Sequence, residues 1–77
     1  MRPHLIVEMD STGLPYAEVP GSSMWDLVEY LSYQRIAVTY QYHATHFTVT
    51  FLRQGTAAAQ QVLDAWASAQ AGVLQSA

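Results

Sequence analysis

The stretch from Arg35 to Arg53, RIAVTYQYHATHFTVTFLR, alternates apolar and polar positions over almost its whole length. A two-residue period is typical of strands with one buried face. When the stretch folds back at Ala44-Thr45, most apolar residues of one arm lie opposite apolar residues of the other, and most polar residues lie opposite polar ones. A slip of one residue would put the apolar set in water, so the pattern fixes the register. The predicted pairs are Ile36 with Arg53, Val38 with Phe51, Tyr40 with Val49 and Tyr42 with Phe47 on the apolar face, and Ala37 with Leu52, Thr39 with Thr50, Gln41 with Thr48 and His43 with His46 on the other.

A further short strand is predicted before this hairpin. His4–Met9 is an apolar run bounded by Pro3 and by the turn-forming residues 10–13. Tyr16–Val19 has two interpretations. It forms either an edge strand that turns back through Ser11-Thr12-Gly13 or a loop, because Pro15 disfavours a central strand.

Two helices are predicted, one on each side of the hairpin. Ser22 or Ser23 caps the first helix, which ends near Gln34, and Thr56 caps the second, in which Gly72 is the expected stop. Apolar residues recur at helical spacing in both segments and form the faces turned to the core. These stripes are Met24, Leu27, Val28 and Leu31 in the first helix, and Ala59, Val62, Leu63 and Trp66 in the second, whose residues Gln60, Gln61 and Asp64 face water.

These elements predict a small α+β domain with an antiparallel or mixed sheet and both helices on one face. The order is β-α-β-β-α, or β-β-α-β-β-α if Tyr16–Val19 is a strand. The expected arrangement is a split βαβ, ferredoxin-like sheet that lacks its last strand. In it, the strand at His4–Met9 lies beside that of His46–Leu52 and parallel to that of Arg35–Tyr42. Residues 1–72 form the single domain and residues 73–77 form a tail.

The charges restrict the classes of function. The chain has three Lys and Arg residues against six Asp and Glu, a net charge of −3, so it offers no basic patch for a nucleic acid. It has no cysteine, which excludes disulfides and thiolate chemistry. Neither a transmembrane run nor a signal peptide is visible, and the expected location is the cytoplasm. No nucleophile stands beside an evident base, and we expect a protein without enzymatic activity.

His43 and His46 are the residues most suggestive of a metal site. They flank the two-residue turn and point to the same face. In the expected strand order Asp10 approaches His46, and two histidines with a carboxylate suit zinc or non-haem iron. A polar hairpin tip without a metal explains the same residues, so we expect no cofactor and keep this site as the alternative function.

Two polar or aromatic surfaces are candidates for a partner. Thr39, Thr48 and Thr50, with Gln41, make a hydroxyl-rich sheet face, for which a solvated surface is the favoured interpretation. Trp25, Tyr30 and Tyr33 lie off the core stripe of the first helix and are residue types that anchor protein contacts. The competing interpretation is that Trp25 and Tyr30 fold over the edges of the core.

The preferred function is a small acidic module, without enzymatic activity, that binds another protein and forms a homodimer. A domain of this size has a marginal core, which a subunit contact would enlarge. The strand at His4–Met9 has no Lys to guard its open edge, and Ile6 lies on the face that should be polar. We therefore expect the dimer to form along that edge. If Tyr16–Val19 occupies the edge instead, we expect a monomer or a dimer through the helix aromatics.

Overall fold

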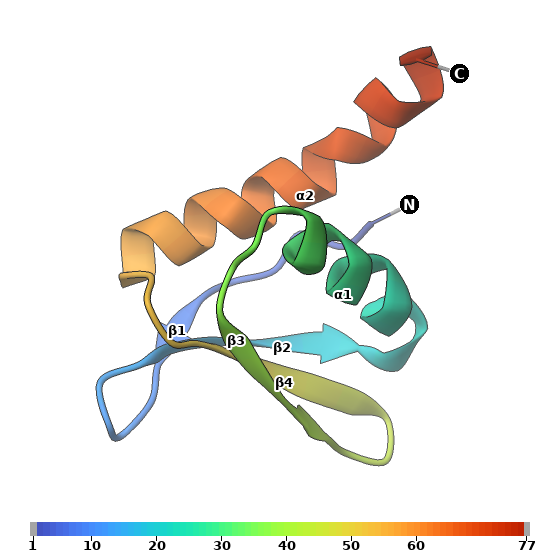
Figure 1. Ribbon diagram of the computed structural model, residues 1–77. Helices are drawn as coiled ribbons and strands as arrows, with labels where there is room; N and C mark the ends of the chain where they lie inside the picture. Colours follow the sequence, from blue (N-terminus) through green and yellow to red (C-terminus); the bar gives the residue numbers. More distant parts are fainter. Residues whose placement is uncertain (1, 77) are drawn as a thin grey trace.

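The protein folds into one antiparallel sheet with both helices packed on the same face of the sheet (Figure 1). The computed structural model describes residues 2–76, with side chains through Ser68. No helix within this part of the chain is long and apolar enough to cross a membrane. The elements are β1 (Glu8–Met9), β2 (Pro15–Pro20), a 3₁₀ turn (Gly21–Ser23), α1 (Met24–Tyr33), β3 (Val38–Tyr42), β4 (His46–Phe51) and α2 (Thr56–Ser76).

The β3–β4 hairpin has the predicted register. Val38 lies opposite Phe51, Tyr40 opposite Val49, and Tyr42 opposite Phe47. The alternation of large apolar with polar side chains determines this pairing, since only one register buries Phe47, Val49 and Phe51 together.

The strand order is β1-β2-β4-β3, which differs from the expected order. β2 lies beside β4, with Ala17 opposite Val49, whereas β1 lies at the edge and pairs only with β2. The expectation that the first strand neighbours His46–Leu52 and runs parallel to Arg35–Tyr42 is therefore wrong, and the β-β-α-β-β-α order holds. β2 takes the place beside β4 because every second side chain of β2 is buried, so that Ala17 and Val19 add two apolar side chains to the core. Pro15 and Pro20 stand at the two ends of β2, where prolines are tolerated.

The N-terminal strand is shorter than predicted, because a helix side chain replaces a neighbouring strand. The Val7 N–H donates to Gln60 Oε1 at 2.9 Å, and Gln60 Nε2 donates to the Leu5 carbonyl at 2.8 Å. The same Nε2 also donates to Asp64 Oδ1 at 2.9 Å. The expectation that Gln60 simply faces water is wrong, since its amide binds the N-terminal arm to α2.

The core lies between the sheet and the two helices. Val49 and Phe51 of the hairpin, Leu27 and Leu31 of α1, and Leu63 and Trp66 of α2 are fully inside it, and Val38 packs against them while remaining half-buried. α2 packs its predicted stripe into or against the core, whereas α1 does so with Leu27, Leu31 and the partly buried Met24. The buried apolar residues are Leu5, Val7, Ala17, Val19, Leu27, Leu31, Phe47, Val49, Phe51, Ala59, Leu63 and Trp66.

α1 begins and ends where the sequence predicted, with Ser23 at its N-cap and Gln34 at its C-cap, but the predicted side-chain capping bonds are not formed. Ser23 makes no side-chain capping bond, and the buried Thr56 Oγ1 has no hydrogen-bond partner among the described residues. α1 ends in a Schellman motif, in which Ile36 N–H donates to the Leu31 carbonyl and Arg35 N–H to that of Ser32, both at 3.1 Å. Arg35 occupies the left-handed position of this motif, with φ 57°.

α2 continues to Ser76, so Gly72 does not end it as predicted. A glycine within a helix costs only about 1 kcal/mol relative to alanine, which good helix formers on both sides can offset. The predicted tail from residue 73 is therefore helical as far as Ser76.

Arg2 holds the N-terminal arm against both helices. Its Nε and Nη2 donate to the two carboxylate oxygens of Asp26 at 2.7 and 2.8 Å, and its Nη1 donates to the Trp66 carbonyl at 2.7 Å. The guanidinium also lies over the Trp66 ring, 5.4 Å from its centroid. Arg2 therefore joins the N-terminal arm to Asp26 of α1 and to Trp66 of α2.

Candidate functional site

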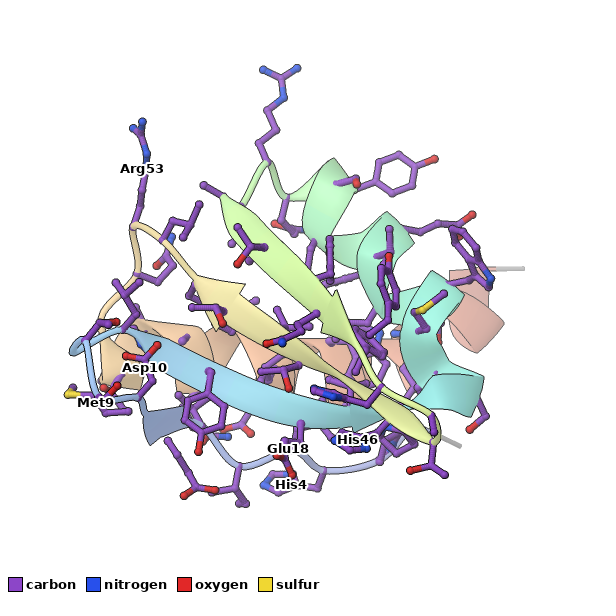
Figure 2. All side chains as sticks on the ribbon, turned by 90° about the horizontal axis from the view of Figure 1, so that it is seen from below. His4, Met9, Asp10, Glu18, His46 and Arg53 are labelled. Carbon is purple, nitrogen blue, oxygen red and sulfur yellow. The ribbon has the colours of Figure 1, made fainter. Side chains whose placement is uncertain are left out.

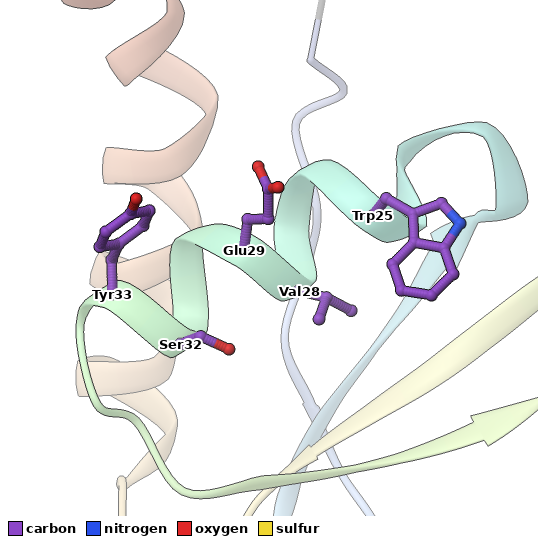
Figure 3. Close-up of a pocket in the computed structure, with 5 residues that line it drawn as sticks. All are labelled: Trp25, Val28, Glu29, Ser32 and Tyr33. Atoms are coloured by element: carbon purple, nitrogen blue, oxygen red, sulfur yellow. The ribbon is translucent and has the colours of Figure 1, made fainter.

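A shallow hollow follows the outer face of α1. It has a volume of about 510 Å³ and is lined by Trp25, Val28, Glu29, Ser32 and Tyr33 (Figure 3). The hollow forms on this face because Leu27 and Leu31 turn the opposite face of the helix into the core. Val28 was expected in the core stripe, but it is only half-buried and lies in the hollow.

The two aromatic residues of the hollow stand at opposite ends of α1. Trp25 is 71% exposed and Tyr33 is 85% exposed, whereas Tyr30 is half-buried and packs against the core. The three aromatic residues predicted as a partner surface therefore differ in exposure. Trp25 and Tyr33 project into solvent, and Tyr30 covers an edge of the core.

The hollow is mostly apolar and carries little charge. Glu29 is its one acidic lining residue, and in Figure 3 the Glu29 carboxylate points away from Val28. The neighbouring Asp26 already binds Arg2 through both oxygens. A surface of this kind can bind an apolar or aromatic segment with little charge to desolvate.

The free edge of β3 runs beneath this hollow (Figure 3). His43 N–H donates to the His46 carbonyl at 2.8 Å and Leu52 N–H to the Ala37 carbonyl at 3.0 Å, so the odd-numbered residues of β3 carry the bonds to β4. The backbone N–H and C=O groups of Val38, Tyr40 and Tyr42 therefore point away from β4, and β3 is the last strand of the sheet. Burial raises the pKa of the Tyr40 hydroxyl above its ordinary value of 10.0, and electrostatic repulsion from Tyr42 raises it further.

The hairpin tip brings together two of the three predicted metal ligands. The rings of His43 and His46 stack with their centroids 4.5 Å apart. His43 Nε2 lies 3.1 Å from Thr48 Oγ1, and His46 Nδ1 lies 3.3 Å from Thr45 Oγ1. Each imidazole thus already has a hydroxyl neighbour.

Asp10 lies at the other end of the sheet from His46 (Figure 2). β2 separates the two, since its first residues pair with β1 while Pro20 pairs with His46. The Asp10 carboxylate accepts bonds from Thr12 Oγ1 at 2.6 Å and from the Leu14 N–H at 2.9 Å, and the Thr12 bond contributes most to lowering its pKa. Within the described residues, no three His, Cys, Asp or Glu side chains are placed to hold a metal ion.

The hydroxyl-rich face and the N-terminal edge complete the predicted surfaces. Thr39 and Gln41 are exposed and Thr48 and Thr50 are half-buried, on the sheet face opposite the helices. Ile6 is 63% exposed, but it lies in the arm before β1, where the backbone groups of its neighbours are bonded to Gln60. The arm does not present the continuous open edge that the sequence suggested.

Sequence reasoning missed the β3 edge as part of a site. The signal was present, because the chain carries no charged residue between Arg35 and Arg53. Comparison with protein-family models, with curated proteins and with solved structures finds no match to this chain.

Proposed function

We propose that this acidic chain acts without enzymatic activity, as a module that binds a protein partner through the hollow on α1. The observation that carries the proposal is the exposure of Trp25 and Tyr33 on either side of Val28. Tryptophan and tyrosine supply much of the binding energy in protein interfaces, because they bury a large area and lose little conformational freedom. Four apolar or weakly polar positions along one helix, beside a single acidic one, also suit a protein partner better than a small polar substrate.

Site-specific photocrosslinking tests this proposal. The photoreactive residue p-benzoylphenylalanine replaces Tyr33 in one variant and, as a matched control, the exposed apolar Met9 in another. After irradiation in the native host, we expect a defined protein adduct from position 33 and none from position 9. Trp25→Ala should remove the adduct, and because Trp25 is exposed this change should leave the fold intact. Equal labelling from both positions, or an adduct indifferent to Trp25→Ala, would refute the proposal.

We also infer a ferredoxin-like order for the sheet, in which the closing strand comes first along the chain rather than last. β2 and β3 run in the same direction on either side of β4, and α1 connects them, which supports a split βαβ unit. β1 lies beside β2, in the place of the closing strand that the sequence prediction left empty. This likeness concerns the fold and adds nothing to the functional argument.

A further inference from the structure

The two edges of the sheet are protected very differently. β1 has only two residues, and Gln60 binds the Val7 N–H and the Leu5 carbonyl in the arm that precedes it. β3 has five residues without Lys, Pro or any charge. Natural sheets usually block such an edge, because its free N–H and C=O groups can pair with another strand. The N-terminal edge is covered and the β3 edge is open.

We propose that the partner is a second copy of this chain, which joins through antiparallel pairing of two β3 strands about a twofold axis at Tyr40. This inference rests on the proposed function and names the partner of the same surface. Tyr40 would pair with the partner's Tyr40, and Val38 with Tyr42 of the partner subunit. In each copy, the backbone N–H and C=O groups of Val38, Tyr40 and Tyr42 would then all be hydrogen-bonded, since these are the groups that point away from β4. No other register about a twofold axis uses all of them.

The direction of α1 makes its aromatic residues complementary in this dimer. The start of the helical segment lies near the hairpin tip, where Gly21 N–H donates to the Thr45 carbonyl at 3.3 Å. The end of α1 lies near the start of β3 (Figure 1). A twofold axis at Tyr40 therefore brings Trp25 of each copy to the level of the partner's Tyr33. Each exposed aromatic residue meets the other type across the interface, as an isologous contact requires.

Charge and area both favour this occupant. A chain with a net charge of −3 repels its own copies in general, but β3 is uncharged, Asp26 is paired with Arg2, and Glu29 is the one acidic residue that lines the hollow on α1. The contact therefore brings few like charges together. A stable dimer buries about 800 Å² on each partner, roughly a sixth of the 5072 Å² surface of this protein. A five-residue edge is too small for that alone, which is why the α1 surface has to take part.

A pair of charge variants tests both the dimer and its register. Thr39 and Gln41 are exposed on the polar face, and in the proposed pairing Thr39 lies directly opposite the partner's Gln41. Thr39→Lys/Gln41→Lys places like charges opposite one another at two points, whereas Thr39→Lys/Gln41→Glu places opposite charges there. The control Gln61→Lys/Ala65→Lys adds the same charge to the exposed face of α2. Light scattering and sedimentation equilibrium give the mass, and circular dichroism shows that each variant is folded.

We expect wild type, the Lys/Glu variant and the α2 control to have twice the chain mass of 8.5 kDa. The Lys/Lys variant should be monomeric, with a dissociation constant raised at least about tenfold. The inference is overturned if the wild type is monomeric at hundreds of micromolar. It is also overturned if the wild type is a dimer but the Lys/Lys and Lys/Glu variants have the same mass and dissociation constant. A monomer that still forms the specific adduct from position 33 refutes the second copy and leaves the proposed function standing. Absence of that adduct refutes both.

Discussion

Gln60 offers the sharpest test of how the N-terminal arm is held. Its side-chain amide binds Val7 N–H and the Leu5 carbonyl, and Gln60→Ala removes both bonds while leaving those backbone groups partly buried. A hydrogen bond contributes about 0.5–1.5 kcal/mol net, and an unsatisfied buried group costs about 1–3 kcal/mol. The higher helix propensity of alanine stabilises the variant by roughly 0.4 kcal/mol and offsets part of this loss. We therefore expect Gln60→Ala to lower the free energy of unfolding by about 2 kcal/mol.

The neighbouring Gln61 provides a matched control, because it is exposed on the same helix and the same change there removes the same atoms. In a domain of this size, 2 kcal/mol corresponds to a fall in Tm of about 8–16 °C. Thermal and urea unfolding followed by circular dichroism measure the difference, and hydrogen exchange at Val7 reports the lost bond directly. Equal stability of the Gln60→Ala and Gln61→Ala variants would refute the role assigned to this amide.

Three further substitutions test the core, a helix end and the arm. Phe51→Ala removes a fully buried ring and should cost about 3–5 kcal/mol, enough to unfold most of the protein, and an unchanged melting temperature would show that the ring is not packed as described. Arg35→Gly should raise the free energy of unfolding by about 1 kcal/mol, because Arg35 has φ 57°; destabilisation in urea titrations would contradict that origin of strain. Arg2→Lys should lower the free energy of unfolding by about 1 kcal/mol through loss of the two-pronged bond to Asp26, whereas the exposed Arg53→Lys should have no effect, and equal urea midpoints would argue against the Arg2 contact.

The hairpin and the helix stripes could be predicted from sequence because their signals are local and periodic. The pairing of Val38 with Phe51 follows from alternation over a short loop, without any knowledge of the rest of the chain. Leu27, Leu31, Leu63 and Trp66 occupy helical spacings that allow only one buried face.

The strand order could not be predicted in this way, because it depends on competition between distant segments. Tyr16–Val19 carries a weak local signal between prolines, yet Ala17 and Val19 fill the place beside β4 that the stronger run at His4–Met9 was expected to take. The error carried over to the metal hypothesis, since Asp10 lies near His46 only in the order that was wrong. Polar side chains with structural roles were also missed, because nothing in the local pattern distinguishes Gln60 from Gln61.

Hydrogen exchange along β3 tests the proposed surface most directly. Thr39 and Gln41 donate toward β4, so their amides should be protected at every protein concentration. The Tyr40 amide points to the free edge. We expect it to be protected in concentrated solution, where two β3 strands pair, and to exchange freely on dilution. A Tyr40 amide that exchanges at the unprotected rate at all concentrations, beside protected neighbours, would show that the edge binds no second copy.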